Sequence, residues 1–298
     1  MRRLCQVLGV PAGGYCAWQT EQQRAVDQQT SAWETALLKA LGVHQRRYGT
    51  RRPQVAPREK GHAVGRQRLR SAMRRRGLHA PRPKACAPRT TDSTHEPRRA
   101  PNRLLDQPKP TQANQVWVSD ATYLPLANGE WAYPCAFQDR CTKHVVGRHV
   151  GATMPEELVT TALQRAFFAQ PPTPSLIVHS DRGGQYRGNA YRQRLHGNAC
   201  TATPARQRLH GHEAVRSQSR RRECYDNAQA GSLWSRLKTE VLERREWPVF
   251  ADLADAQAGI ADYFDYHNHD RLHSSIGYQT PYHTHQQLLQ TNALNCPA

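Results

Sequence analysis

The clearest pattern in the chain is a set of short apolar segments, separated by turns, that begins near residue 115. Three of these segments, 115–124, 131–139 and 143–150, have the length and the β-branched or aromatic content of strands. Asn128-Gly129 is typical of a tight hairpin turn, and residues 140–142 predict a second turn. We therefore expect an antiparallel meander.

A helix and a further strand follow the meander. Residues 154–168 repeat apolar side chains at helical spacing, namely Leu158, Ala162, Leu163 and Ala166. Three prolines at 171–174 end this helix, and the apolar run Leu176–Val178 predicts a buried strand that leads to Asp181. Three strands, a helix and another strand begin a ribonuclease H-like fold. We therefore expect an α/β domain with a mixed five-stranded sheet flanked by helices, in which the first and fourth strands are neighbours.

The N-terminal part of the chain has helical patterns only. Residues 2–18 predict two short helices around Gly9–Pro11, residues 31–42 a longer helix, and residues 64–77 an arginine-rich helix. This order resembles a helix-turn-helix region, in which the second helix enters a major groove and its cations hold phosphates. The candidate DNA-binding residues are Arg66, Arg68, Arg70, Arg74, Arg75 and Arg76. The alternative is a surface helix whose arginines are only solvated.

The charge of the chain is concentrated in the same part. The net charge of the 298 residues is +18, and residues 1–113 hold 23 Lys and Arg against 7 Asp and Glu. A basic segment joined to a near-neutral domain indicates a module that binds a polyanion such as nucleic acid, the alternative being a solvated, disordered arm. We expect a basic DNA-binding region at 1–79, a Pro- and Arg-rich linker at 80–113, a core at 114–285 and a tail at 286–298.

The cysteines and the apolar runs bear on the cell compartment. The eight cysteines form no C-x-x-C pair, which favours free thiols in a reducing cytoplasm over a zinc site. The N-terminal apolar run is too short for a signal peptide, and no stretch is long enough to span a membrane. A His-rich segment at 266–273 leaves zinc as a minor alternative.

Two of the predicted strands lead to an aspartate. Asp120 shares one face of its strand with Val116 and Val118, and an acid on an apolar face needs compensation because burial of an unpaired charge is costly. A metal ion would compensate it, and an arginine partner is the alternative. Since the first and fourth strands are neighbours in the expected fold, Asp120 and Asp181 should meet.

Five motifs occur in a specific order along the chain. They are V-W-V-S-D-A-T-Y, H-S-D-R-G-G-Q-Y, D-N-A, L-K-T-E and R-L-H-S-S-I-G-Y-Q-T-P. In this order the motifs resemble the second-frame (OrfB) transposases of the bacterial insertion-sequence group whose prototype carries the number three. These proteins belong to the DDE transposase and retroviral integrase superfamily, and the resemblance covers nearly the whole chain.

The resemblance implies a DNA transposase that binds the ends of its element and carries out metal-dependent strand cleavage and transfer. Three carboxylates would hold two Mg²⁺ (or Mn²⁺) ions that activate a water or a DNA 3′-hydroxyl. Asp120 and Asp181 match the first two acids, and Lys238 matches a basic residue seven positions after the third. The implied partners are double-stranded DNA, as terminal inverted repeats and as target, further copies of the chain on that DNA, and the product of an upstream reading frame. The implied location is the nucleoid of a bacterial cytoplasm, with no membrane association.

Position 231 departs from the family pattern. The family motif D-N-A-x-x-E-S corresponds here to Asp226–Ser232, and the position of its glutamate is occupied by Gly231. Glycine offers no ligand atom in a side chain and costs a helix about 1 kcal/mol relative to alanine. The nearby acids Asp226 and Glu240 have a different helical phase from residue 231.

The spacing between the acids also departs from the family. The family places 35 residues between the second and third acids, whereas 49 separate Asp181 from Gly231. The hexapeptide R-Q-R-L-H-G occurs at Arg192–Gly197 and again at Arg206–Gly211, an offset of 14 that equals the surplus. This repeat indicates one inserted segment near 192–211. A third departure is Arg222, where the family usually has glycine.

These departures predict a transposase by descent whose catalysis is impaired. The main alternative is a non-catalytic DNA-binding protein derived from a transposase. A metal-dependent nuclease on the same fold and a decayed reading frame whose product does not fold are two further alternatives.

Overall fold

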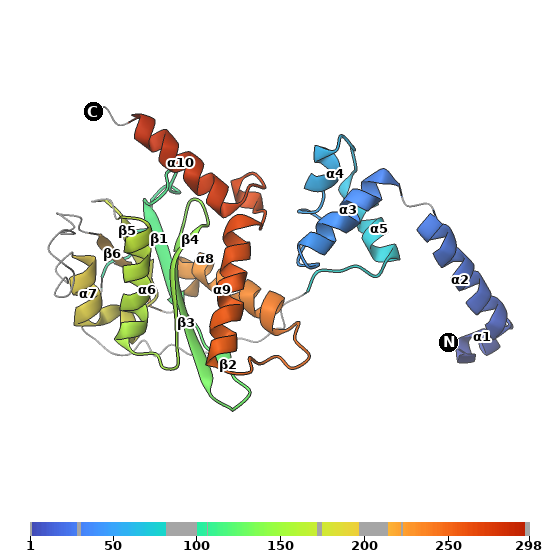
Figure 1. The fold of residues 1–298 in the computed structure, drawn as a ribbon, viewed down its shortest axis with the longest axis horizontal. Helices are drawn as coiled ribbons and strands as arrows, with labels where there is room; N and C mark the ends of the chain where they lie inside the picture. The colour runs from blue at the N-terminus through green and yellow to red at the C-terminus, as the bar shows by residue number, and fades with distance from the viewer. Residues whose placement is uncertain are drawn as a thin grey trace. The chain divides into compact units, whose positions relative to one another are not determined.

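The protein is represented by a computed structural model that describes residues 2–28, 31–81, 100–105, 107–171, 175–196, 214–221 and 223–295. The chain divides into two compact units, Met1–Ala80 and Pro81–Ala298 (Figure 1). Among the described residues, none of the helices combines the length and the apolar character that a bilayer crossing requires.

The first unit is all-α. Its helices are α1 (Arg2–Val7), α2 (Ala12–Gln28), α3 (Ala32–Val43), α4 (Val55–Glu59) and α5 (Arg66–Arg75). The helices predicted at 31–42 and 64–77 are confirmed as α3 and α5. The helix α4 was not predicted, because its five residues, which include one proline and two charged side chains, are too few to show a periodic pattern. The buried apolar side chains of this unit include Trp33, Leu37, Leu41, Tyr48, Leu69 and Met73.

The second unit is built on a mixed sheet. Its strands are β1 (Val116–Ala121), β2 (Leu124–Pro125), β3 (Trp131–Asp139), β4 (Val145–Gly151), β5 (Ile177–Ser180) and β6 (Val215–Gln218). The strand order is β4-β3-β1-β5-β6, and the two-residue β2 pairs with the start of β3. The β1–β3 and β3–β4 pairs are antiparallel, whereas β1–β5 and β5–β6 are parallel. The meander and the ribonuclease H-like arrangement are thus confirmed, and β2 adds a sixth strand to the five expected.

Helices cover both faces of this sheet (Figure 1). On one face, α6 (Glu156–Ala169) and α7 (Asn189–Leu195) pack on alternate strand residues such as Trp117 and Phe137. On the other face, α8 (Ala228–Leu237) and α9 (Leu253–His269) pack on residues such as Ala136 and Val145. A Cβ at Gly147 would lie 2.5 Å from that of Ala166. Glycine in β4 therefore permits the close approach of α6.

The C-terminal end of the second unit is helical where the sequence predicted a tail. The helix α10 (Pro281–Asn295) contains residues 286–295, which had been assigned to a tail. Its apolar positions are too few to form a stripe, so the pattern did not reveal it. Buried His285 joins α10 to the β3–β4 turn, where its Nδ1 lies 3.0 Å from the Thr142 hydroxyl.

The C-terminal part of the predicted linker lies along the outer strand β6. The Ala100 amide donates to the Gln218 side chain at 3.1 Å, and the Arg103 amide donates to the Ser217 hydroxyl at 2.9 Å. The Gln218 amide in turn donates to the carbonyl of Pro101 at 3.4 Å. Linker residues 82–99, residues 197–213 (which include most of the predicted insertion near 192–211) and Arg222 lie outside the described residues.

Candidate active site

Asp120 and Asp181 lie next to one another at the ends of two adjacent strands. The parallel register of β1 and β5 pairs Val116 with Ile177 and continues to Ser119 with Ser180. Asp120 and Asp181 are the next two residues of this register. Neighbouring positions of parallel strands point to the same face of a sheet. The structure therefore brings the two aspartates together, on the face that α8 covers.

The electrostatics of the two carboxyl groups reflect this proximity. Burial, together with repulsion from Asp181, raises the pKa of Asp120 to about 8. Burial likewise raises the pKa of Asp181, although a hydrogen bond from the Gly183 amide and the charge of Arg187 act in the opposite direction. Two neighbouring carboxylates that disfavour each other's charge are suited to a divalent cation, which would remove the repulsion.

Hydrogen bonds hold the ends of both strands. The Gly183 amide donates to Asp181 Oδ1 at 2.9 Å, and the Ala121 amide donates to Asp120 Oδ1 at 2.9 Å. The side chain of Asn227 donates to the Ser119 carbonyl at 2.9 Å. This contact attaches the 3₁₀ turn Cys224–Asn227, and with it the start of α8, to the strand that carries Asp120.

Position 231 faces open space. Gly231 is exposed on α8, and a Cβ at this position would meet no atom within 4 Å. Lys238, seven residues further on, is close enough to Asp120 to lower its pKa, and its Nζ lies 5.1 Å from the centre of the Tyr123 ring. Residues seven apart share one face of a helix. A longer side chain at position 231 therefore has room on the face of α8 that also presents Lys238.

The two other nearby acids are already engaged by arginines. Asp226 accepts hydrogen bonds from the Arg220 guanidinium and from Asn102, and the Arg220 bonds hold the pKa of Asp226 at about 2. Glu240 is buried and forms a two-pronged ion pair with Arg271. Both carboxylates are therefore paired with arginines. Among the described residues, no group of three or more His, Cys, Asp or Glu side chains is placed to hold a metal ion.

The arginines of α5 differ in their surroundings. Arg75 and Arg76 bind the buried Glu34 of α3, at 2.8 and 3.2 Å. Arg68 lies over the Trp33 ring at 5.1 Å, and Arg66 donates to the Thr50 hydroxyl at 3.2 Å. These four side chains contribute to the packing of the unit.

Arg70 and Arg74 are exposed, and neither forms an ion pair within the described part of the chain. They lie four residues apart and so occupy one helical face. This pair contributes to the solvent-facing cationic surface of α5, which also includes the exposed Arg66, Arg68 and Arg75.

Two residues near the acids had not been singled out from the sequence. Asn227 fixes the turn before α8, and the Tyr123 ring lies beneath Lys238. Asn227 belongs to the motif D-N-A and Tyr123 to V-W-V-S-D-A-T-Y. The motifs therefore included both residues, but their spacing did not indicate a role for either.

Comparison with known proteins identifies the family. Two models of the integrase core domain match residues 110–209 and 214–281. The chain is 35% identical to an insertion element IS600 protein of 31 kDa from Shigella sonnei, over 93% of this chain and 96% of that protein. It is 28% identical to transposase InsF for insertion sequence IS3A of Escherichia coli (strain K12), over 94% of this chain and 92% of that protein. The catalytic core domain of HTLV-2 integrase in complex with magnesium aligns with a TM-score of 0.42 and 11% identity, over 59% of this chain and 98% of that chain.

The second unit thus belongs to the class of integrase core domains. The whole chain belongs to the insertion-sequence transposases of the DDE and integrase superfamily.

Proposed function

We propose that this chain binds the terminal inverted repeats of its own element and is impaired in metal-dependent cleavage and transfer of the DNA strands. One observation carries the proposal: Asp120 and Asp181 are adjacent, while α8 presents Gly231 where the family has its third acid. Two ligands in place of three weaken the hold on divalent ions and leave one ion poorly placed.

Asp120 and Asp181 are the residues that would hold Mg²⁺ or Mn²⁺. A bound ion would activate the attacking hydroxyl and stabilise charge on the phosphate. Lys238 lies beside Asp120 and is placed to hold the DNA phosphate near the carboxylates. Arg70 and Arg74 of α5 are placed to bind the duplex backbone. We further propose target DNA and a second copy of the chain as partners. From the family resemblance alone, we also propose the upstream-frame product as a partner and the bacterial nucleoid as the location.

The test is a strand-transfer assay on the element's own terminal repeats, with three proteins. We expect the natural chain to remain near background and Gly231→Glu to raise the rate by about 10²-fold or more, because an added ligand completes the site. Gly231→Gln is the matched control, since it has the same size without the charge. Turnover of the natural chain equal to that of Gly231→Glu would refute the proposal.

The inserted segment requires a separate arm. Removal of residues 198–211 restores the family spacing and leaves one copy of the repeat. If Gly231→Glu alone is inactive, the variant with both changes shows whether the insertion is a second defect. Retained binding of the repeats without cleavage in every variant would favour the second candidate, a DNA-binding protein without catalysis, to which the exposed Arg70 and Arg74 also point.

A further inference from the structure

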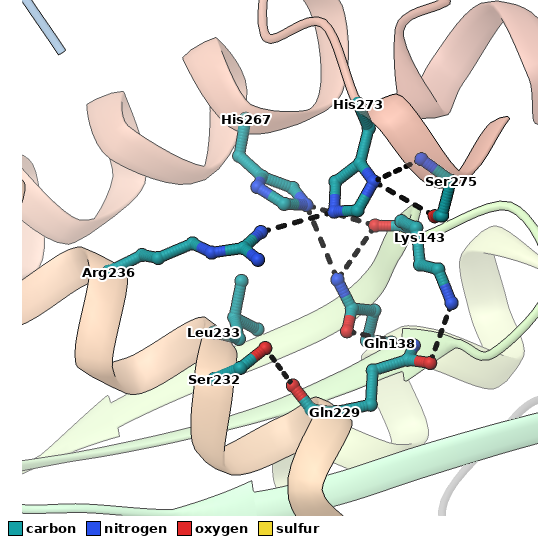
Figure 2. Close-up of a pocket in the computed structure, with 9 residues that line it drawn as sticks. All are labelled: Gln138, Lys143, Gln229, Ser232, Leu233, Arg236, His267, His273 and Ser275. Carbon is teal, nitrogen blue, oxygen red and sulfur yellow. Dashed lines mark hydrogen bonds between the residues drawn. The ribbon is translucent and has the colours of Figure 1, made fainter. Parts of the chain in front are cut away.

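A cavity of about 250 Å³ lies against α8 (Figure 2). By helical spacing, the face of α8 that lines it differs from the face of Gly231 and Lys238. The residues that α8 contributes are spaced as one helical stripe: Gln229, Ser232, Leu233 and Arg236. The other walls come from the end of β3, the β3–β4 turn, α9 and the segment after it: Gln138, Lys143, His267, His273 and Ser275. The cavity therefore joins three stretches of the second unit that are distant in sequence, 138–143, 229–236 and 267–275.

The cavity is cationic. Lys143 and Arg236 line it, and none of the nine described residues around it is acidic. The Lys143 ammonium donates to the Arg140 carbonyl at 2.6 Å and to Gln229 Oε1 at 2.8 Å, both neutral acceptors. Arg236 Nη1 lies 3.1 Å from Nε2 of His273, which must accept because a guanidinium only donates. In the described part of the chain, neither cation is paired with a carboxylate.

Partial burial makes these charges costly. Burial lowers the pKa of the Lys143 ammonium and of the Arg236 guanidinium, although the charges of Asp139 and Glu240, respectively, act in the opposite direction. An anion in the cavity would offset that cost by direct pairing.

The backbone at Lys143 supports a functional reading. Its φ is +67°, in the left-handed region that glycine and asparagine adopt more easily than lysine. Strain of this kind is typical of sites where one side chain must be held in one direction. In Figure 2 the Lys143 ammonium extends to Gln229, in the wall of the cavity.

We propose that this cavity binds a phosphate group, with Lys143 and Arg236 as its cationic ligands. A free phosphate carries up to two negative charges near neutral pH and a backbone phosphodiester carries one, so either is attracted to the two cations. The tetrahedral oxygens can accept hydrogen bonds from several walls at once. The Ser275 hydroxyl lines the cavity as a further hydrogen-bonding group, whereas Ser232 and Gln138 already donate to the carbonyls of Gln229 and Lys143. A bound phosphate would bridge α8 to the β3–β4 turn, and α8 carries position 231.

The phosphate has two sources with the same chemistry, a DNA backbone or a free phosphate. Phosphate binding in this cavity can be tested independently of the proposed strand transfer, because the binding assay requires no catalysis.

The test titrates inorganic phosphate into the full chain by calorimetry at constant ionic strength. The variants are Arg236→Gln and Lys143→Asn, of which the second also suits the left-handed backbone. Arg165→Gln is the matched control, because it removes one exposed cation from α6. We expect the phosphate affinity to fall about tenfold or more in both cavity variants and to stay unchanged in the control.

A second arm separates the sources. If DNA supplies the phosphate, inorganic phosphate weakens duplex binding to the natural chain but not to Arg236→Gln. If a free phosphate is the occupant, Arg236→Gln binds duplex DNA as tightly as the natural chain. The melting temperature of each variant shows whether it is folded. If Arg236→Gln is unfolded, the phosphate affinity of Lys143→Asn still tests the proposal. Phosphate affinity equal in the natural chain and in a folded cavity variant overturns the proposal, as does no binding at millimolar phosphate.

Discussion

The ion pair between Glu240 and Arg271 allows a sharp test of the site's chemistry. Glu240 belongs to a π-helical turn, Lys238–Leu242, that follows α8 directly. Its side chain is 7% exposed and that of Arg271 only 1%, and Arg271 Nη2 lies 2.5 Å from Glu240 Oε1. The change Glu240→Gln keeps the shape but leaves the arginine charge buried without a counter-charge. Removal of one partner from a buried pair costs about 3–5 kcal/mol, and we expect the free energy of unfolding to fall by this amount.

Urea denaturation of the full chain measures the effect. The control is Asp255→Asn, which removes the ion pair with Arg245, whose side chains are 32% and 33% exposed. That change should cost no more than about 1 kcal/mol, because solvent screens the pair. The double variant Glu240→Leu/Arg271→Met should lose less free energy of unfolding than Glu240→Gln, since it leaves no unpaired buried charge. A negligible cost for Glu240→Gln, combined with weaker Mg²⁺ binding, would show that Glu240 is free to act as a metal ligand and would refute the reasoning.

Two further predictions concern the first unit and acid stability. Arg70→Gln and Arg74→Gln should each weaken duplex binding and reduce the slope of log affinity against log salt by about 0.9. Glu34→Gln removes the partner of Arg75 and Arg76, so it should instead lower the melting temperature of the first unit. Equal effects of all three changes on DNA binding and none on melting would contradict this division. Burial lowers the pKa of His267 from 6.5 to about 3. As the pH falls below about 6.5, this histidine therefore becomes protonated in the unfolded chain but stays neutral in the folded chain. Between pH 7 and pH 5 this difference should remove about 2 kcal/mol of stability, and His267→Gln should flatten that dependence in urea denaturation.

The sequence predicted the elements whose patterns are strong. The segment 131–139 coincides with β3, because apolar residues fill it and turns bound it on both sides. The adjacency of Asp120 and Asp181 followed from the strand order, and the register confirms it. Weak patterns failed: α4 is too short to show a period, and α10 lacks an apolar stripe.

Contacts between distant residues were beyond the reach of the sequence. The partner of Arg75 is Glu34, 41 positions earlier, and that of Glu240 is Arg271, 31 positions later. Nothing in a local pattern distinguishes such arginines from Arg70 and Arg74, which remain at the surface. The cavity beside α8 was not predicted for the same reason, because its walls come from segments that are distant in sequence.

The segment that lies along β6 has a consequence for assembly. An outer strand with unpaired amides and carbonyls can accept a strand from another molecule. Here the chain's own residues 100–103 occupy that position, and the Gln218 amide is already bonded to the carbonyl of Pro101. Copies gathered on one DNA molecule therefore cannot join by extending the sheet across β6 unless this segment is first displaced. On that side, any contact with a second copy would have to use helices and loops in place of backbone pairing with β6.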